Sequence, residues 1–291
     1  TSRNGPKEVQ GVVVRRTDGV RTVKANKAVI LACGGFEANE EMKNQYWQMK
    51  PVLAATTNSN TGDGIRMAQE LGARLWHMWH YHGSYGFQHP DYPYAIRMKR
   101  LPDWIPDREA TAVVQMTWIV VDQHGKRYMS ENPPYTQDTS HRPMEHFDTV
   151  TQSFPRIPSY VIFDEVGRRR YRVGAPTRND PEVEYDWSQD NMQEIESGLI
   201  KKADSIAELA KLVDIDPETL EATLARWNEM CASKNDEDFG RPSGTMMKIQ
   251  RPPFYVGEVW PVVSNTQGGP EHDSKQRIID VNDKPIPRLY A

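Results

Sequence analysis

The 291-residue sequence predicts a globular protein that mixes α-helices with β-strands, and three stretches support this fold class. Residues 27–33 (KAVILAC) form a continuous apolar run typical of a buried strand, and two glycines follow it. Residues 203–231 contain two runs with helical spacing and clear capping residues. Residues 251–263 (RPPFYVGEVWPVV) read as a strand interrupted by prolines.

The N-terminal part is predicted to begin with antiparallel strands and to continue with two helices. The sequence TDGV supplies the turn between the first two strands, because Asp and Gly favour tight turns. Asn39 is a suitable N-cap for the first helix, and Gly72 is a suitable residue to end the second. The expected elements are strands over 8–16, 21–25 and 27–33 and helices over 36–49 and 65–75.

The rest of the chain alternates strands and helices after an irregular, aromatic and proline-rich stretch over 76–158. Within that stretch, two strand-like runs over 113–129 are joined by a turn. Ser205 and Glu208 form a capping box for the first of two later helices, and Asp216 caps the second. The expected elements are a strand over 159–166, helices over 203–213 and 216–231, a strand over 251–263 and a hairpin over 277–291.

Composition and charge exclude several classes of protein. A formal net charge of −4 and a pI near 6.1 give no basic footprint for nucleic acid. No apolar run approaches the roughly 18 residues that would suggest a membrane span. The two cysteines, Cys33 and Cys231, match neither a disulfide framework nor a metal site, so we expect a reducing compartment and a cytoplasmic location. Cys33 lies in the apolar run and is expected to be a small core residue.

Two glycine-bearing turns are candidate ligand sites. Cys33-Gly34-Gly35 ends the apolar strand, and glycine is needed where a ligand touches the backbone, because a Cβ would fill that space. NTGDG (60–64) stands at the start of a predicted helix, where free N–H groups and the helix dipole favour anions. The alternative for the first turn is a plain strand-to-helix connection. For the second it is an ordinary helix start with Asp63 as a first-turn acid.

The order of the motifs along the chain resembles the flavoprotein superfamily of fumarate reductases, succinate dehydrogenase flavoprotein subunits and 3-ketosteroid dehydrogenases. That superfamily has an apolar strand ending A-x-G-G-F and then T-G-D-G before a helix, as at 32–36 and 61–64. A G-K/R-R-F/Y-x-x-E motif, T-x-G-G and G-x-P-I-P-G-L-Y-A follow in the same order. The corresponding segments here are 125–131, 266–269 and 283–291, so the matching order spans nearly the whole chain.

The resemblance implies FAD as the cofactor. It also implies a fold composed of an α+β cap domain, which binds substrate, and part of an α/β FAD-binding domain of the fumarate reductase/glutathione reductase-like type. The expected division is 1–75 for the end of the first FAD-domain segment, 76–250 for the cap and 251–291 for the return to the FAD domain. The residues expected to bind FAD are Ala32, Gly34, Gly35, Thr61, Gly62, Asp63, Asn265, Thr266, Gly268 and Gly269.

Two segments of the superfamily have no counterpart here. One is the G-x-G-x-x-G turn that holds the FAD pyrophosphate, and the other is the glycine-bearing segment that follows L-Y-A. We therefore expect both ends of the chain to lie inside a longer protein. An alternative from a different functional class is a non-catalytic piece, which would be a folded cap with remnants of a sheet and no bound FAD.

The segment SENPPY (130–135) resembles the 3-ketosteroid dehydrogenases, in which a tyrosine at this place exchanges a proton with the substrate. Moving hydrogen across a C–C bond beside a carbonyl requires hydride transfer at the flavin and a positioned acid/base. Tyr135 fits this role if its neighbours lower the phenol pKa from its usual value near 10. The substrate would be an enone or ketone, with an unidentified electron donor or acceptor. The other interpretation of Tyr135 is a loop aromatic that only packs.

The competing enzyme hypothesis is a fumarate-reductase-like reduction of an unsaturated carboxylate. Fumarate reductases of the superfamily carry an arginine proton donor near the position of Tyr135, and a histidine pair where Ser264 and Asn265 stand here. An arginine donor in this chain would be Arg127 or Arg142. Arg127 also has a structural interpretation, as a partner of Glu131.

The sequence HMWHYH (77–82) suggests a metal site at first sight. No carboxylate or cysteine accompanies the histidines at fixed spacing, so no metal is expected. By chain order, the stretch falls near a substrate-binding histidine of fumarate reductases, and we expect His80 or His82 to line the substrate pocket. The surrounding aromatic residues would form either an aromatic-walled pocket or ordinary core packing.

Overall fold

The structure is a computed structural model that describes residues 8–100, 115–133, 140–177, 180 and 182–291. The chain divides into two compact units, each built from several segments of the sequence. Unit 1 comprises Thr1–Gln48, Asn58–Tyr81 and Asn265–Ala291, and unit 2 comprises Met49–Thr57 and His82–Ser264.

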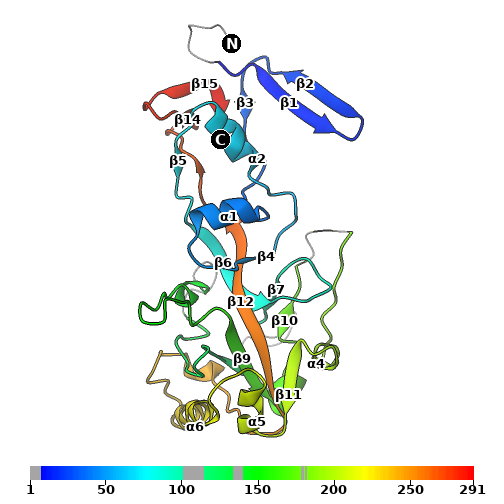
Figure 1. The fold of residues 1–291 in the computed structure, drawn as a ribbon, viewed down its shortest axis with the longest axis vertical. Helices are drawn as coiled ribbons and strands as arrows, with labels where there is room; N and C mark the ends of the chain where they lie inside the picture. The colour runs from blue at the N-terminus through cyan, green and yellow to red at the C-terminus, as the bar shows by residue number, and fades with distance from the viewer. Residues whose placement is uncertain (1–7, 101–114, 134–139, 178–179, 181) are drawn as a thin grey trace. The chain divides into compact units, whose positions relative to one another are not determined.

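Unit 1 contains a three-stranded sheet and two helices (Figure 1). In the sheet, β15 lies between β14, which is antiparallel to it, and β3, which is parallel. The core of this unit includes Ala68, Ala73, Ile278 and Leu289, which join helix α2 to the sheet. The elements are β3 (Val29–Ile30), α1 (Glu40–Tyr46), α2 (Asp63–Glu70), β5 (Leu75–Trp76), β13 (Gly269–Pro270), β14 (Arg277–Ile279) and β15 (Pro285–Tyr290).

The local signals in this unit are confirmed. The side chain of Asn39 accepts a hydrogen bond from the backbone N–H of Met42 and so caps α1. The predicted hairpin turn near Asn282 is present, because Asp280 accepts hydrogen bonds from the backbone N–H groups of Asn282 and Lys284. Short-range polar contacts of this kind depend only on neighbouring residues, so the sequence is sufficient to predict them.

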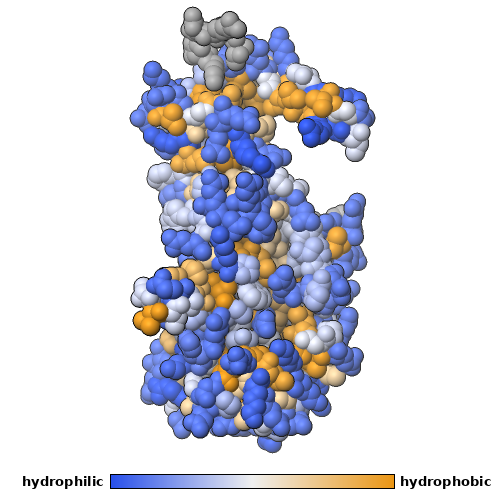
Figure 2. All heavy atoms as spheres, in the orientation of Figure 1, coloured by the Kyte–Doolittle hydropathy of each residue, from blue (hydrophilic) through white to orange (hydrophobic). Residues whose placement is uncertain are grey.

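Strands β1 (Gly11–Arg16) and β2 (Gly19–Lys24) form the predicted antiparallel pair, with Val13 opposite Thr22. Figure 2 shows apolar side chains along the surface of this ribbon. The exposed ones are Val13, Val14, Val20 and Val23. The valine-rich sequence therefore forms two paired strands, but within the described residues neither face of this pair is buried.

The predicted buried strand over 27–33 is wrong in length and in burial. Only Val29 and Ile30 are in β3, Ile30 is 72% exposed and Cys33 is exposed. The apolar run correctly indicates a strand, but burial depends on what packs against each face. In the described chain β3 pairs with β15 alone, and no other strand covers its free edge.

Unit 2 is built on an eight-stranded sheet in which the long strand β12 is central (Figure 1). The order along the sheet is β10-β7-β6-β12-β9-β8, and β4 and β11 also pair with β12. The strands are β4 (Leu53–Ala54), β6 (Tyr81–Phe87), β7 (Ile96–Met98), β8 (Trp118–Val121), β9 (Ser159–Asp164), β10 (Gly174–Ala175), β11 (Ile200–Ala203) and β12 (Phe254–Thr266). Of the two runs predicted over 113–129, the second makes only an isolated bridge, between Val121 and Arg127.

Helices α5 and α6 cover one part of this sheet and close the main core. Both begin at the predicted caps, since Ser205 accepts from the Glu208 N–H and Asp216 from the Thr219 N–H. Trp227 on α6 is fully buried in the cluster between these helices and strands β8, β9 and β12. The helices described in this unit are α3 (Glu165–Arg170), α4 (Met192–Glu196), α5 (Ile206–Lys211) and α6 (Pro217–Ser233), with the 3-10 turns η1 (Arg142–Met144) and η2 (Ser243–Thr245).

The chain passes between the units at different residues from the domain boundaries expected above. The changes follow Tyr81 and Ser264, rather than residues 75 and 250, because β6 and most of β12 belong to the sheet of unit 2. Residues 49–57 also belong to unit 2, since β4 pairs with β12. Among the described residues, no helix is both long and apolar enough to cross a bilayer.

Candidate functional site

Two glycine-bearing segments that are far apart in the sequence meet in unit 1. The backbone N–H of Phe36 donates to Thr266 Oγ1 at 3.3 Å, and the backbone N–H of Thr266 donates to Glu37 Oε1 at 2.8 Å. These reciprocal hydrogen bonds join the turn at Gly34-Gly35 to the loop that carries Gly268 and Gly269. We call this arrangement the glycine junction.

The turn before helix α2 also belongs to the glycine junction. The N–H of Gly62 donates to the carbonyl of Gly35 at 2.9 Å, and the N–H of Ala38 donates to the carbonyl of Asn60 at 3.0 Å. Gly34 and Gly62 both have φ near +80°, a conformation that glycine adopts without strain. Hydrogen bonds therefore connect the three predicted FAD-binding stretches: the turn at Gly34-Gly35 is bonded directly to Gly62, and the residues that follow it are bonded to Thr266.

The glycines of the junction are required mainly by the chain's own packing. A Cβ on Gly35 would lie 1.9 Å from Thr266 Oγ1, and a Cβ on Gly268 would lie 2.5 Å from the Cα of Met78. A Cβ on Gly269, in contrast, would meet nothing within 4 Å. The sequence analysis expected these glycines to let a ligand approach the backbone closely. There is open space for a ligand at Gly269, but at Gly35 the side chain of Thr266 already fills that position.

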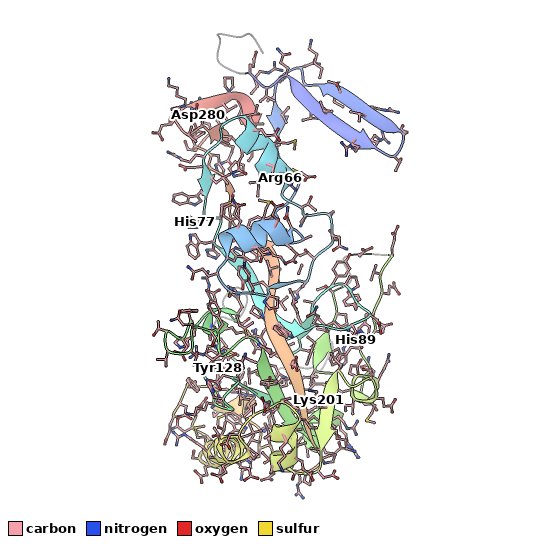
Figure 3. All side chains as sticks on the ribbon, viewed as in Figure 1. Arg66, His77, His89, Tyr128, Lys201 and Asp280 are labelled. Atoms are coloured by element: carbon pink, nitrogen blue, oxygen red, sulfur yellow. The ribbon has the colours of Figure 1, made fainter. Side chains whose placement is uncertain are left out.

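The other predicted FAD-binding residues are more exposed. Thr61 Oγ1 donates to Asp63 Oδ1 at 3.1 Å, and Asp63 lies 3.6 Å from the guanidinium of Arg66, which Figure 3 labels on α2. Ala32 and Asn265 are exposed. These contacts agree with the alternative interpretation of Asp63 as an ordinary acidic residue in the first turn of α2. Its side chain is exposed to solvent.

The histidine-rich segment is bonded to the same loop by its backbone. The N–H of Gln267 donates to the carbonyl of His80 at 3.0 Å, and His77, labelled in Figure 3, has a φ of 52°. The His77 ring stacks on Trp76 with centroids 4.4 Å apart. His82 lies on β6 and belongs to unit 2, so the two predicted substrate histidines fall in different units.

The predicted aromatic wall divides between surface and core. Trp76 and Trp79 are each 57% exposed, whereas Tyr81, Tyr85 and Phe87 are buried. In the part of the chain that the structure describes, no three His, Cys, Asp or Glu side chains are placed to hold a metal ion.

Arg127 lies at the centre of a buried ionic cluster in unit 2. Its guanidinium donates to Glu131 Oε2 at 2.9 Å and to Asp236 Oδ2 at 3.0 Å. The side chain is 3% exposed, and the ring of Trp227 stands 4.4 Å from the guanidinium carbon. Every side of the group is therefore occupied by protein, which favours the structural interpretation of Arg127 over the proton-donor one.

Arg241 completes this cluster and was not singled out by the sequence. It donates to Glu131 Oε2 at 3.2 Å and to the carbonyls of Trp118 and Met116. Burial raises the pKa of Glu131, but the attraction of Arg127 and Arg241 outweighs it and holds the pKa below the usual value. Glu131 is therefore a charged anchor at the start of the segment that leads to Tyr135.

A pocket of about 330 Å³ lies beside this anchor in unit 2. Burial raises the pKa of Tyr85 to about 12, so its phenol is neutral at physiological pH. Arg142, the alternative arginine of the sequence, contributes to the wall. Tyr135 itself lies outside the described residues, two positions after Pro133 of the wall. The lining residues are Tyr85, Tyr128, Met129, Ser130, Glu131, Pro133, Ser140, Arg142, Pro143 and Phe239.

The fold and these sites define a class of protein. Unit 1 contains a junction of glycine turns and a short parallel strand pair, and unit 2 contains a largely apolar pocket that Tyr85 of β6 helps to line. Together they are typical of a mixed α/β protein that binds a cofactor and a small molecule.

Comparison with known proteins identifies the family. The family described as FAD binding domain matches residues 1–291, and the chain belongs to it. A 3-oxosteroid 1-dehydrogenase of Mycobacterium tuberculosis is 29% identical over 306 residues, which cover 97% of this chain and 50% of that protein. A probable fumarate reductase of Shewanella frigidimarina is 25% identical, with 99% of this chain and 42% of that protein covered.

A solved structure supports the same fold. The crystal structure of a 3-ketosteroid delta1-dehydrogenase from Sterolibacterium denitrificans matches with a TM-score of 0.78 and 25% identity, covering 98% of this chain and 50% of that one. The chain thus spans half or less of the length of each of these relatives. The predicted superfamily and the predicted cofactor, FAD, are confirmed.

The glycine junction leads to a prediction about FAD. Gly35→Ala is expected to raise the Kd for FAD by about tenfold or more, because a methyl group 1.9 Å from Thr266 Oγ1 forces the turn and the loop apart. Fluorescence titration of the purified protein with FAD measures this. Gly269→Ala is the companion variant, because it leaves the protein's own packing intact and reports approach of the ligand. An unchanged Kd in Gly35→Ala would show that FAD does not depend on the closure of the junction.

Proposed function

We propose that this protein belongs to an FAD-dependent oxidoreductase that moves hydrogen across a C–C bond next to a carbonyl, as a dehydrogenation or as an enone reduction. The observation that carries the proposal is the glycine junction, because it joins the predicted FAD-binding segments at 34–36, 61–62 and 266 by hydrogen bonds. The names of the relatives, a 3-oxosteroid 1-dehydrogenase and a 3-ketosteroid delta1-dehydrogenase, support the reaction class.

The chain's residues fit FAD in two respects. The space beside Gly269 is open to a ligand, and one carboxylate oxygen of Glu37 is buried at the junction without a hydrogen-bond partner among the described residues. In this proposal the FAD-binding residues are the ten predicted from the sequence, and FAD supplies acceptance or donation of hydride. The backbone turns of unit 1 hold the cofactor, whereas unit 2 acts as the cap that covers the substrate and excludes water.

Tyr135 is proposed as the acid/base that exchanges the proton on the carbon next to the one that gives or receives hydride. Its place in the chain supports this, because it follows Glu131, which two arginines anchor, and Pro133, which lines the pocket. The mostly apolar side chains of the pocket suit a substrate with an extended apolar body and a carbonyl group. His80 or His82 is proposed to contact the substrate.

Spectroscopy and turnover test this function together. The purified protein is expected to show flavin absorption in the visible range and to bleach when a 3-ketosteroid is added without oxygen. A coloured protein that leaves every ketone and enone unchanged would contradict the reaction class. A colourless protein that takes up no added FAD would instead favour the non-catalytic cap.

Reduction of an unsaturated carboxylate is the second candidate, and one observation favours it. Arg142 lines the pocket of unit 2 with 31% of its side chain exposed, and its guanidinium lies 3.5 Å from the carboxylate of Glu145, so a cationic group stands at the pocket wall. The fumarate reductase relative points the same way. Turnover of fumarate or another enoate that is lost in Arg142→Ala, with ketones left unchanged, would establish this candidate.

A further inference from the structure

Glu37 is a buried carboxylate that no motif of the sequence singled out. It follows Phe36 directly and is 2% exposed. Its Oε1 accepts the hydrogen bond from the Thr266 N–H, whereas its Oε2 is buried and has no hydrogen-bond partner among the described residues. A buried carboxylate oxygen without a donor costs more than an ordinary lost hydrogen bond, so this atom requires an explanation.

The position of the carboxylate connects it to the cofactor site. Both oxygens lie on the side of Gly35 that has no side chain, since an added Cβ there would be 2.9 Å from Oε1 and 3.1 Å from Oε2. The same Cβ would be 1.9 Å from Thr266 Oγ1. Glu37 therefore lies inside the glycine junction, between the turn at Gly34-Gly35 and the loop that begins at Thr266.

We propose that Glu37 is a cofactor-positioning residue with two separate tasks. Through Oε1 it fixes the Thr266 N–H and so holds the loop against the turn. Through Oε2 it accepts a hydrogen bond from a donor of bound FAD, either a hydroxyl of the sugar chain or a ring N–H. This inference rests on the proposed function only in requiring that the protein binds FAD, and it adds a buried carboxylate to the ten residues predicted from the sequence.

The two tasks can be separated by substitution. Glu37→Gln retains the length of the side chain and an oxygen for the Thr266 N–H, but it places an NH₂ group where Oε2 was. Two donors then face each other, so we expect the Kd for FAD to rise by about 10- to 100-fold. Glu37→Asp keeps both acceptor oxygens on a shorter stem and is expected to bind FAD more tightly than Glu37→Gln does. Glu41→Gln removes the same charge from an exposed position nearby and is the matched control.

The measurements are fluorescence titration with FAD, the visible spectrum of the loaded protein and the melting temperature without FAD. The proposal is supported if Glu37→Gln binds weakly, Glu37→Asp binds better, and Glu41→Gln binds as the unmodified protein does. It is overturned if Glu37→Gln binds FAD within about threefold of the unmodified protein. It is also overturned if Glu37→Asp is weaker than Glu37→Gln, because side-chain length and the Thr266 contact would then account for the effect.

The result is distinguishable from failure of the proposed function. If the unmodified protein binds no FAD, the proposed function itself fails. If all variants bind FAD equally, only the role of Glu37 is rejected. The melting temperature without FAD separates the clamp on Thr266 from the contact with the cofactor, since loss of the clamp lowers it in the absence of any ligand.

Discussion

Arg127→Ala is expected to lower the free energy of unfolding by about 3 to 5 kcal/mol, the largest stability effect we expect in unit 2. The reason is that the substitution leaves Glu131 and Asp236, whose side chains are fully buried, without their shared cation. Removing the guanidinium also removes its contacts with the rings of Trp227 and Phe239. Chemical denaturation followed by tryptophan fluorescence measures the change.

Arg226→Ala provides the matched control for this experiment. Arg226 is on α6, is 53% exposed and pairs with Asp238 at the surface, so its loss is expected to change the free energy of unfolding far less than the loss of Arg127 does. If Arg127→Ala is as stable as Arg226→Ala, the buried cluster does not stabilise the unit. A stable Arg127→Ala protein that binds FAD but has lost turnover would restore the proton-donor interpretation of Arg127.

The features that could be predicted from the sequence are those that depend on neighbouring residues. The caps Asn39, Ser205 and Asp216 all form the expected hydrogen bonds, because the backbone N–H that donates to each cap is three residues further along the chain. The motif order was also sufficient to identify the superfamily and FAD. When two residues are only a few positions apart, their types and spacing are sufficient to predict the contact between them.

The features that were missed depend on partners far away in the sequence. Glu37 and Thr266 are separated by 229 positions, and Arg241 and Glu131 by 110. Nothing near Glu37 in the sequence indicates that its carboxylate turns inward, since an acidic residue after a glycine turn is normally solvated. The burial of 27–33 was mispredicted for a related reason, because an apolar run does not say whether another element covers it.

Tyr135→Phe is expected to lower kcat by about 10²- to 10⁴-fold while leaving the flavin spectrum and the Kd for FAD unchanged. The phenol oxygen is the only atom removed, and in the proposed function it carries the proton that accompanies hydride transfer. KM is expected to change little, because the ring of the residue remains. Stopped-flow measurement of flavin reduction by a 3-ketosteroid separates this chemical step from substrate binding.

Two further variants make this prediction decisive. Tyr160→Phe removes a phenol oxygen from β9, outside the lining of the pocket, and is expected to retain nearly full activity. Arg142→Ala tests the carboxylate hypothesis in the reverse assay, the reoxidation of reduced flavin by fumarate, because there a group at the pocket must donate a proton. If flavin reduction is as fast in Tyr135→Phe as in the unmodified protein, another group must accept the proton that leaves the substrate. If fumarate then reoxidises the flavin slowly in Arg142→Ala and at the unmodified rate in Tyr135→Phe, the arginine is the acid that the reduction of an enoate requires.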